Sequence, residues 1–370
     1  MKKVYLVTGL ACSGKTTIAK QLADELNCKM VGLDRIYEKI NEDFNIPDDL
    51  KLKTPYFNTW ENLSFIGVES LGKYTNLESC VRDYYRELFE DKPDLLVIEG
   101  VSPIFNSREM SILKEEFKDY EMRCIFLNID YETWLDNRSK RKRIVANYTY
   151  GAVPPFMLPE EYNVENEKIR QLLPDNYLEI NSYHQFNAHI TERSYQGEAL
   201  NEPKWDKFHF DLNEMKGKSI LDISCNSGWY LKKFQEAGAE VYGIDADWRI
   251  LDACLDRVPQ AKVKVCRAEN LNEFTFGKKF DYVLCSSAFH YYVNREQVLE
   301  NISKLTDYFV LELPLLEEPG DDILYQEQYH YAIPSRDLIF KWLNKYFSKV
   351  EQIDITDYNG VLRPVLKSIK

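Results

Sequence analysis

Apolar runs of strand length alternate with stretches of helical spacing through the first half of the chain. The candidates for buried strands are residues 3–8, 28–33, 94–98, 123–129 and 176–181. The spacing of apolar positions predicts helices near residues 15–26, 77–90, 108–119, 131–143 and 160–172. Strands that alternate with helices of this length are typical of βαβ units. We therefore expect an α/β fold with a parallel sheet in this half.

A second alternation of the same kind begins after Asn181. A strand, a loop of small residues and a helix are expected within residues 218–230. Further strands are expected at 239–245, 262–266, within 280–291 and at 310–314, with a closing antiparallel hairpin at 350–355 and 361–369. The fold class is thus two doubly wound α/β domains, at residues 1–182 and 183–370. Since no Gly/Ser-rich linker marks the boundary, the domains are expected to touch.

Composition restricts the class of protein. A chain of 370 residues with 44% hydrophobic and 29% charged residues is expected to be a soluble, cytoplasmic protein of about two domains. Its apolar runs are too short for a membrane span, and the eight cysteines are scattered without a C-x-x-C motif. The net charge of −13 weighs against nucleic acid as a partner without excluding it.

The first strand candidate leads into a glycine-rich loop. Residues 9–16 read GLACSGKT, which fits the pattern G-x-x-x-x-G-K-[ST] between a strand and a helix. Such a loop presents backbone N–H groups that bind an anion such as the β-phosphate of ATP. Lys15 would reach the β- and γ-phosphates, and Thr16 would ligate Mg²⁺. The residues expected to hold ATP are Gly9, Ser13, Gly14, Lys15, Thr16 and Thr17; the alternative is an ordinary glycine turn.

Charged residues follow the next strands in positions that phosphate transfer requires. Asp34 follows the second strand and Glu99 the third, so both are expected at the ligand edge of a parallel sheet. Asp34 would accept the proton of an attacking hydroxyl, and Glu99 would hold Mg²⁺. The alternative for each is a helix cap or a solvated charge. Arg138 and Arg141, on a basic helix, would neutralise the charge of the transferred phosphoryl group. The alternative is a basic helix end that is exposed to solvent and has no role in transfer.

Together these features resemble the P-loop small-molecule kinases related to nucleoside monophosphate kinases. The likeness is greatest to branches that phosphorylate a hydroxyl, such as gluconate kinase and the kinase part of polynucleotide kinase. In those branches an aspartate after the second strand is the general base, and this role maps onto Asp34. The acceptor side departs from the pattern, because residues 44–74, with Tyr56, Phe57 and Trp60, match no acceptor signature.

The second half has its own cofactor motif. Residues 222–228 read DISCNSG after a strand, and Asp245 ends the next strand. Small residues let the backbone approach a ligand closely, and the second acid can hydrogen-bond ribose hydroxyls. A dinucleotide-binding domain is the main alternative, but it normally requires G-x-G-x-x-G after its first strand.

This arrangement resembles the class I S-adenosylmethionine-dependent methyltransferases, whose motif D-x-G-C-G-x-G has Ser224 and Asn226 here in place of two glycines. Asparagine in the second place is similar to the branch of tRNA wobble-uridine carboxymethyltransferases. The resemblance implies a cofactor site at Asp222, Ser224, Asn226, Gly228, Asp245, Ala268, Glu269 and Ser286. It also places His290 near the methyl acceptor, either as a base or packed on the cofactor. His184, Arg193 and Tyr195 precede this domain and are candidate substrate contacts, with interdomain packing as the alternative.

The sequence thus predicts a bifunctional enzyme. ATP and Mg²⁺ would serve phosphorylation of a hydroxyl on a small molecule, sugar or glycan end, and S-adenosylmethionine would serve methylation of the same or a related product. One alternative is RNA or tRNA modification by a polynucleotide-kinase-like domain and an RNA methyltransferase. Another is a regulatory nucleotide-binding module without chemistry, against which the intact Lys15, Thr16, Asp34 and Glu99 argue. Neither a membrane partner nor a particular oligomer is predicted.

Overall fold

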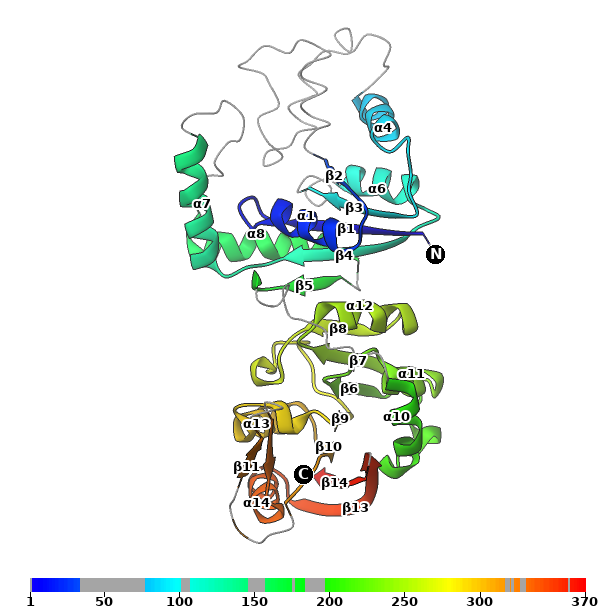
Figure 1. Cartoon of the computed structure of the whole chain (residues 1–370), viewed down its shortest axis with the longest axis vertical. Coiled ribbons are helices and arrows are strands. Elements are labelled where there is room, and N and C mark those ends of the chain that lie inside the picture. Colours follow the sequence, from blue (N-terminus) through cyan, green and yellow to red (C-terminus); the bar gives the residue numbers. More distant parts are fainter. Residues whose placement is uncertain are drawn as a thin grey trace. The chain divides into compact units, whose positions relative to one another are not determined.

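The fold was analysed in a computed structural model. It describes residues 2–33, 77–100, 107–145, 157–174, 177–183, 197–316, 320, 323–326, 331–358 and 360–370. The chain divides into two compact units, Met1–Phe186 and Asn187–Lys370. The boundary between a kinase-like and a methyltransferase-like domain, expected between residues 182 and 183, stays a prediction. Each unit is described below by itself (Figure 1).

The N-terminal unit contains a five-stranded parallel sheet in the order β2-β3-β1-β4-β5. The strands are β1 (Lys3–Gly9), β2 (Lys29–Gly32), β3 (Leu95–Glu99), β4 (Glu121–Leu127) and β5 (Leu178–Ile180). From its second residue to its end, β1 is buried, as expected of a central strand that is covered on both faces. The expected parallel α/β sheet in this half is confirmed.

Five helices accompany this sheet in the described part of the unit (Figure 1). They are α1 (Lys15–Glu25), α4 (Leu77–Leu88), α6 (Ser107–Glu116), α7 (Tyr131–Val145) and α8 (Pro159–Leu172). Helix α1 begins directly after Gly14, whose φ of 87° glycine adopts without strain, and it ends at Glu25. Asn27, two residues later, has the positive φ that is common after a helix C-terminus. Apolar residues from the helices and strands, Trp134 and Tyr162 among them, form one buried core.

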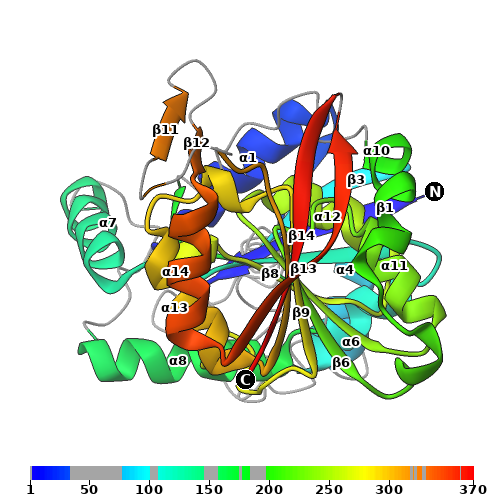
Figure 2. The same cartoon turned by 90° about the horizontal axis from the view of Figure 1, so that it is seen from below.

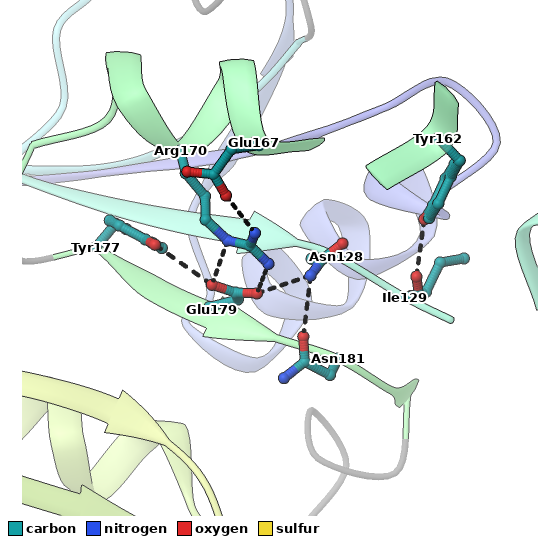
Figure 3. A network of polar contacts seen from close by, with 8 residues as sticks. All are labelled: Asn128, Ile129, Tyr162, Glu167, Arg170, Tyr177, Glu179 and Asn181. Carbon is teal, nitrogen blue, oxygen red and sulfur yellow. Dashed lines mark hydrogen bonds and ion pairs between the residues drawn. The ribbon is translucent and has the colours of Figure 1, made fainter. Parts of the chain in front are cut away.

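A polar network anchors the last strand of this sheet (Figure 3). Glu179 on β5 accepts hydrogen bonds from Arg170 on α8, with N···O distances of 2.7 and 3.1 Å, and from Asn128 after β4, at 2.7 Å. Tyr177 adds a longer contact of 3.3 Å. Because Glu179 is nearly buried, these donors offset the cost of removing its charge from water. They fix the ends of β4 and β5 next to each other.

The C-terminal unit contains a seven-stranded sheet in the order β13-β14-β10-β9-β6-β7-β8. Its strands are β6 (Ser219–Ile223), β7 (Glu240–Asp245), β8 (Lys262–Val265), β9 (Tyr282–Ser286), β10 (Tyr308–Glu312), β13 (Lys349–Tyr358) and β14 (Val361–Ile369). The strands from β6 to β10 are parallel, and β14 is antiparallel to both of its neighbours. The predicted closing hairpin is confirmed.

Helices cover both faces of this second sheet. Figure 2 shows α13 (Arg295–Leu305) and α14 (Arg336–Tyr346) on one side, and α10 (Gly197–Trp205) and α11 (Trp229–Glu236) on the other. The remaining helices are α12 (Trp248–Arg257) and the short 3₁₀ turns η3 (Asp206–Phe208), η4 (Leu212–Glu214), η5 (Ala268–Asn270) and η6 (Phe289–Tyr291). Sequence analysis did not predict the separate antiparallel pair β11 (Ile323–Gln326) and β12 (Tyr331–Pro334). In the described ranges, no helix has the length and apolar character to cross a bilayer.

Candidate functional site

The glycine-rich loop of the N-terminal unit adopts a conformation that its glycines make possible. Gly9 has φ 147° and Gly14 has φ 87°, both in the region that L side chains rarely adopt. A Cβ atom on Gly9 would lie 2.6 Å from the carbonyl oxygen of Leu127. The loop therefore passes close to the end of β4 before it enters α1, and the first N–H groups of α1 lie at its end.

Two polar side chains of this loop are buried in positions that suit a phosphate ligand. The ammonium of Lys15 donates to the carbonyl oxygen of Leu10 at 3.1 Å, and Lys15 is only 6% exposed. The hydroxyl of Ser13 is fully buried without a hydrogen-bond partner in the described part of the chain. Both groups fit a bound phosphate, since each would gain a charged acceptor there. Thr16 and Thr17 are exposed at the start of α1.

Glu99 lies at the same edge of the sheet as this loop. It is the last residue of β3 and pairs in register with Val7 on β1 and with Gly32 on β2. Glu99 is 6% exposed, and its carbonyl oxygen accepts from the N–H of Leu33 at 2.8 Å. Asp34, which follows Leu33, lies outside the described residues.

Only one of the two arginines expected to neutralise the moving phosphate has a described side chain. Arg138 is half-buried on α7, while the side chain of Arg141 lies outside the described part of the chain. His184, Arg193 and Tyr195 also lie outside it, as do Tyr56, Phe57 and Trp60. The roles assigned to these residues stay predictions.

A cavity of about 400 Å³ opens at the carboxyl ends of the parallel strands in the C-terminal unit. Predicted cofactor residues that line it are Asp222, Ser224, Asn226, Asp245, Ala268, Glu269 and Ser286. Gly228 and His290 are not among the described residues that line it. Further lining residues, which sequence analysis did not single out, include Asn201, Lys204, Tyr230, Ser287 and Tyr358. Ligands of open α/β sheets bind at this edge.

The loop after β6 has the backbone of a glycine-rich loop although it holds one glycine. Ser224 (φ 60°), Asn226 (φ 51°) and Gly228 (φ 74°) all have positive φ. Asparagine tolerates this conformation better than most residues. Ser224 is held there by a 2.8 Å hydrogen bond between its hydroxyl and that of Tyr292. Ser224 and Asn226, which stand where the methyltransferase motif has glycines, therefore keep the loop conformation that glycines would allow.

Part of the C-terminal unit is similar in sequence to a known protein family. Residues 221–307 match a family model described as a methyltransferase domain. By this match the C-terminal unit contains a methyltransferase domain. The match covers the end of β6, the strands β7 to β9 and the cavity-lining loops that follow them.

Two curated proteins and one solved structure illustrate the similarity. A tRNA U34 carboxymethyltransferase of Pseudomonas fluorescens is 28% identical over 196 residues, covering 47% of this chain and 57% of that protein. The one of Pseudomonas putida is 27% identical over 173 residues, covering 41% and 52%. A Synechocystis magnesium protoporphyrin IX methyltransferase with bound S-adenosylmethionine is 15% identical over 50% of this chain and 99% of its own, with a TM-score of 0.35. The chain thus spans about half the length of the curated relatives it matches.

Two carboxyl groups of the methyltransferase domain face its cofactor cavity. Asp245 accepts from the backbone N–H groups of Asn226 and Asp247, each at 3.1 Å. Asp222 is 1% exposed, and its Oδ2 has no hydrogen-bond partner among the described residues. Burial raises the pKa of Asp245 to about 6 and, together with the charge of Asp245, raises that of Asp222 well above its usual range. These residues fit a ligand that brings hydroxyl and ammonium donors, as S-adenosylmethionine does.

The methyltransferase domain should bind its cofactor more tightly as the pH rises through the pKa of Asp245. Only the ionised carboxylate accepts with both oxygens, so protonation below about pH 6 weakens ribose hydrogen bonds. We expect the affinity for S-adenosylhomocysteine to rise from about pH 5 to about pH 7, by at most about tenfold per unit. Titration calorimetry of Asp245→Asn at the same pH values should give a flatter profile. If both profiles have the same slope, Asp245 does not control binding.

Gly228 offers a matched test of the cofactor loop. A Cβ atom there would lie 2.5 Å from the Sγ of Cys254, whereas one on Gly217 (φ 73°) would meet nothing within 4 Å. Alanine at Gly217 should cost about 1–2 kcal/mol of unfolding free energy from φ strain alone. Alanine at Gly228 should cost about 1–3 kcal/mol more and weaken S-adenosylhomocysteine binding at least about tenfold, because the loop must shift. Denaturant unfolding and calorimetry of both variants measure this, and equal losses would contradict it.

A buried ionic cluster borders the cavity beside the cofactor residues. Glu312, at the end of β10, is fully buried and lies 3.4 Å from the Nζ of Lys204 on α10. Its oxygens also accept hydrogen bonds from Ser286 (3.1 Å), Ser287 (2.7 Å) and Thr356 (2.7 Å). Burial opposes ionisation of Glu312, but the attraction of the neighbouring cations and these hydrogen bonds hold its pKa below the usual value.

The second cation of this cluster is Arg363 on β14. Its Nη1 donates to the Ser287 hydroxyl at 2.9 Å, and that hydroxyl also accepts from Lys204 at 2.6 Å. Both cations lie over the ring of Tyr358, at 4.3 Å for Arg363 and 4.9 Å for Lys204. Two cations thus surround one carboxylate, and Lys204, Ser287 and Tyr358 line the cavity. Within this cluster the cations outnumber the carboxylate by one, whereas Asp222, Asp245 and Glu269 line other parts of the same cavity.

His290 lies in η6 and is 2% exposed. Burial and the charge of Arg363 lower its pKa to about 3, so the imidazole is neutral near pH 7. An imidazole with so low a pKa is a weak base at neutral pH, and this side chain is absent from the described cavity lining. Its role as a base near the acceptor stays a prediction.

Proposed function

We propose that the chain carries two group-transfer activities. The N-terminal unit phosphorylates a hydroxyl with ATP, and the methyltransferase domain modifies the same or a related product. The observation that carries the first half is the buried Lys15 ammonium at the start of α1, within a loop whose glycines have positive φ. A fixed cation at the N-terminus of a helix is an arrangement suited to polyphosphate.

In this proposal the charged residues of the N-terminal unit have distinct roles. Lys15 holds the β- and γ-phosphates, and Thr16 with Glu99 holds Mg²⁺. Asp34 accepts the proton of the attacking hydroxyl. As it does so, the hydroxyl oxygen bonds to the γ-phosphorus, the bond between the γ-phosphorus and the bridging oxygen of the β-phosphate breaks, and ADP leaves. Arg138 and Arg141 neutralise the charge of the moving phosphoryl group. When bound, S-adenosylmethionine would supply the activated carbon for the other unit.

For the methyltransferase domain, we propose a transferred group that carries a carboxylate. The curated relatives are carboxymethyltransferases by name. The excess of cations over carboxylate in the cluster of Lys204, Arg363 and Glu312 supports the same group here, because an added carboxylate beside Lys204 would balance it. Lys204 is 2% exposed and is already desolvated, so it gains more from an added anion than a surface lysine would.

The acceptor has two candidates. The first is a small molecule, sugar or glycan end with a free hydroxyl. The second is RNA, which the names of the relatives support, since they act on U34 of tRNA. The net charge of −13 favours the first candidate, because RNA binding normally requires clustered basic residues.

Calorimetric titration of the full chain tests the two-activity proposal. We expect one site for Mg²⁺–ATP, lost in Lys15→Ala, and one independent site for S-adenosylhomocysteine, unchanged in that variant. The same S-adenosylhomocysteine isotherm in both proteins shows that the variant is folded. An N-terminal unit that binds no Mg²⁺–ATP at millimolar concentration would overturn the phosphotransferase half.

A further inference from the structure

The carbonyl oxygens on the outer side of the glycine-rich loop are held by side chains from elsewhere in the N-terminal unit. The indole N–H of Trp134 donates to the oxygen of Ala11 at 2.8 Å, and the amide of Asn137 donates to that of Cys12 at 3.0 Å. The hydroxyl of Tyr183 donates to the oxygen of the next residue, Ser13, at 3.1 Å. Three consecutive loop carbonyls therefore have a side-chain donor each.

The three donors are themselves connected. Trp134 and Asn137 lie one helical turn apart on α7, so they face the same side. Asn137 uses the second hydrogen of its amide to donate to the Tyr183 hydroxyl at 2.9 Å. Burial raises the pKa of Tyr183, so its hydroxyl keeps the proton that it donates to the loop.

These contacts determine where the loop N–H groups point. Every described peptide bond is trans, and in a trans peptide the C=O and the following N–H point in opposite directions. Holding the oxygens of Ala11, Cys12 and Ser13 on one side thus directs the N–H groups of Cys12, Ser13 and Gly14 to the other. The Ser13 N–H donates to Leu10 there, the same oxygen that receives the Lys15 ammonium.

We propose that Trp134, Asn137 and Tyr183 are positioning residues that preorganise this loop for polyphosphate, an inference that rests on the phosphotransferase proposal above. Without them, the peptide units of the loop could rotate and turn carbonyl oxygens toward the phosphates, which repel them. The same contacts fix α7 beside the loop, and α7 carries Arg138 directly after Asn137. The three residues thus link the phosphate loop to the helix that bears the predicted lid arginines.

Gly14 belongs to this arrangement. A Cβ atom on Gly14 would lie 2.2 Å from the Tyr183 hydroxyl oxygen and 2.8 Å from its ring. The Tyr183 ring therefore covers the loop at the point where α1 begins. Any side chain at position 14 would displace the donor that holds the Ser13 carbonyl.

Hydrogen exchange of the full chain without ligand tests the proposal, with Tyr183→Phe and Asn137→Ala as variants. Tyr162→Phe is the matched control, because it removes a hydroxyl that donates to the Ile129 carbonyl at 2.7 Å in the same unit (Figure 3). We expect amide exchange in residues 9–18 to rise several-fold in the first two variants and to match wild type in the control. The affinity for Mg²⁺–ATP should fall at least about fivefold in both variants, because each substitution removes two hydrogen bonds of this network, one of which reaches a loop carbonyl.

The two readouts separate the possible failures. If the loop exchanges at the wild-type rate in Tyr183→Phe and Asn137→Ala, the positioning role is wrong, whatever the ATP affinity. If loop exchange rises but the wild-type protein does not bind Mg²⁺–ATP, the three residues do hold the loop and the phosphotransferase proposal fails instead. Equal effects of Tyr162→Phe would show a general loss of stability and would also overturn the proposal.

Discussion

Replacing Lys15 by alanine is expected to lower ATP-dependent phosphate transfer by about 10²- to 10³-fold, the range seen when one fixed donor to a developing charge is removed. The Lys15 ammonium donates to the carbonyl oxygen of Leu10, and Lys15 is buried at the start of α1. Little water therefore competes with a phosphate for this ammonium. Because the charge on the γ-phosphate moves during transfer, the loss should appear mainly in kcat. Initial rates with labelled ATP measure it.

Lys20→Ala is the matched control for this prediction. Lys20 lies on the same helix as Lys15 but is exposed, so its removal changes the net charge equally without changing the loop. We expect its rate to stay within about a factor of two of wild type, since exposed charges contribute little. A similar loss in both variants would mean that Lys15 acts only through the general charge of α1.

The second large effect is expected at the ionic cluster of the methyltransferase domain. Lys204→Met removes one of the two cations that surround the buried Glu312, and it should destabilise the fold by about 3–5 kcal/mol. Group transfer should fall about a hundredfold or more with a carboxylated donor, if Lys204 binds that carboxylate, and clearly less with S-adenosylmethionine. Unfolding by denaturant and transfer rates with both donors measure the two effects.

A double variant separates stability from binding in this cluster. Lys204→Met with Glu312→Gln removes both charges of the 3.4 Å ion pair, so it should recover the part of the unfolding free energy that was lost by separating that pair; the recovery should be partial, because Arg363 then has no carboxylate in the cluster. It should not recover transfer from the carboxylated donor, because the cation at the cavity wall is still missing. Recovery of both would mean that Lys204 serves only to balance Glu312.

Much of the fold could be predicted from local sequence. The strands of both sheets were predicted because continuous apolar runs mark strands that are covered on two faces, as in β1 and β6. Helices such as α1 and α7 were predicted because helical spacing and flanking residues mark them locally. The pair β11 and β12 was missed, since it packs outside the main sheets and lacks a long apolar run.

The two sites differ in how far sequence could predict them. The glycine-rich loop and the loop at 222–228 are contiguous, so their spacing alone indicates a ligand. The cluster of Lys204, Glu312 and Arg363 comes from three distant elements, and only the folded sheet brings them together. Its one local signal was a glutamate at the end of a buried strand. The contacts of Trp134 and Tyr183 with the loop were likewise invisible, because sequence does not show which backbone oxygen a side chain reaches.

The central claim is that one chain transfers both a phosphoryl group and a carbon group. It is tested most directly by incubating the purified full chain with γ-labelled ATP and with S-adenosylmethionine, or its carboxylated form, labelled in the transferred carbon. One library of hydroxyl-bearing small molecules and RNAs serves as acceptor. The account predicts that both labels enter acceptors, that Lys15→Ala abolishes only the phosphate label, and that Asp222→Ala abolishes only the carbon label. Incorporation of the carbon label without any phosphate label, in wild type, would contradict it.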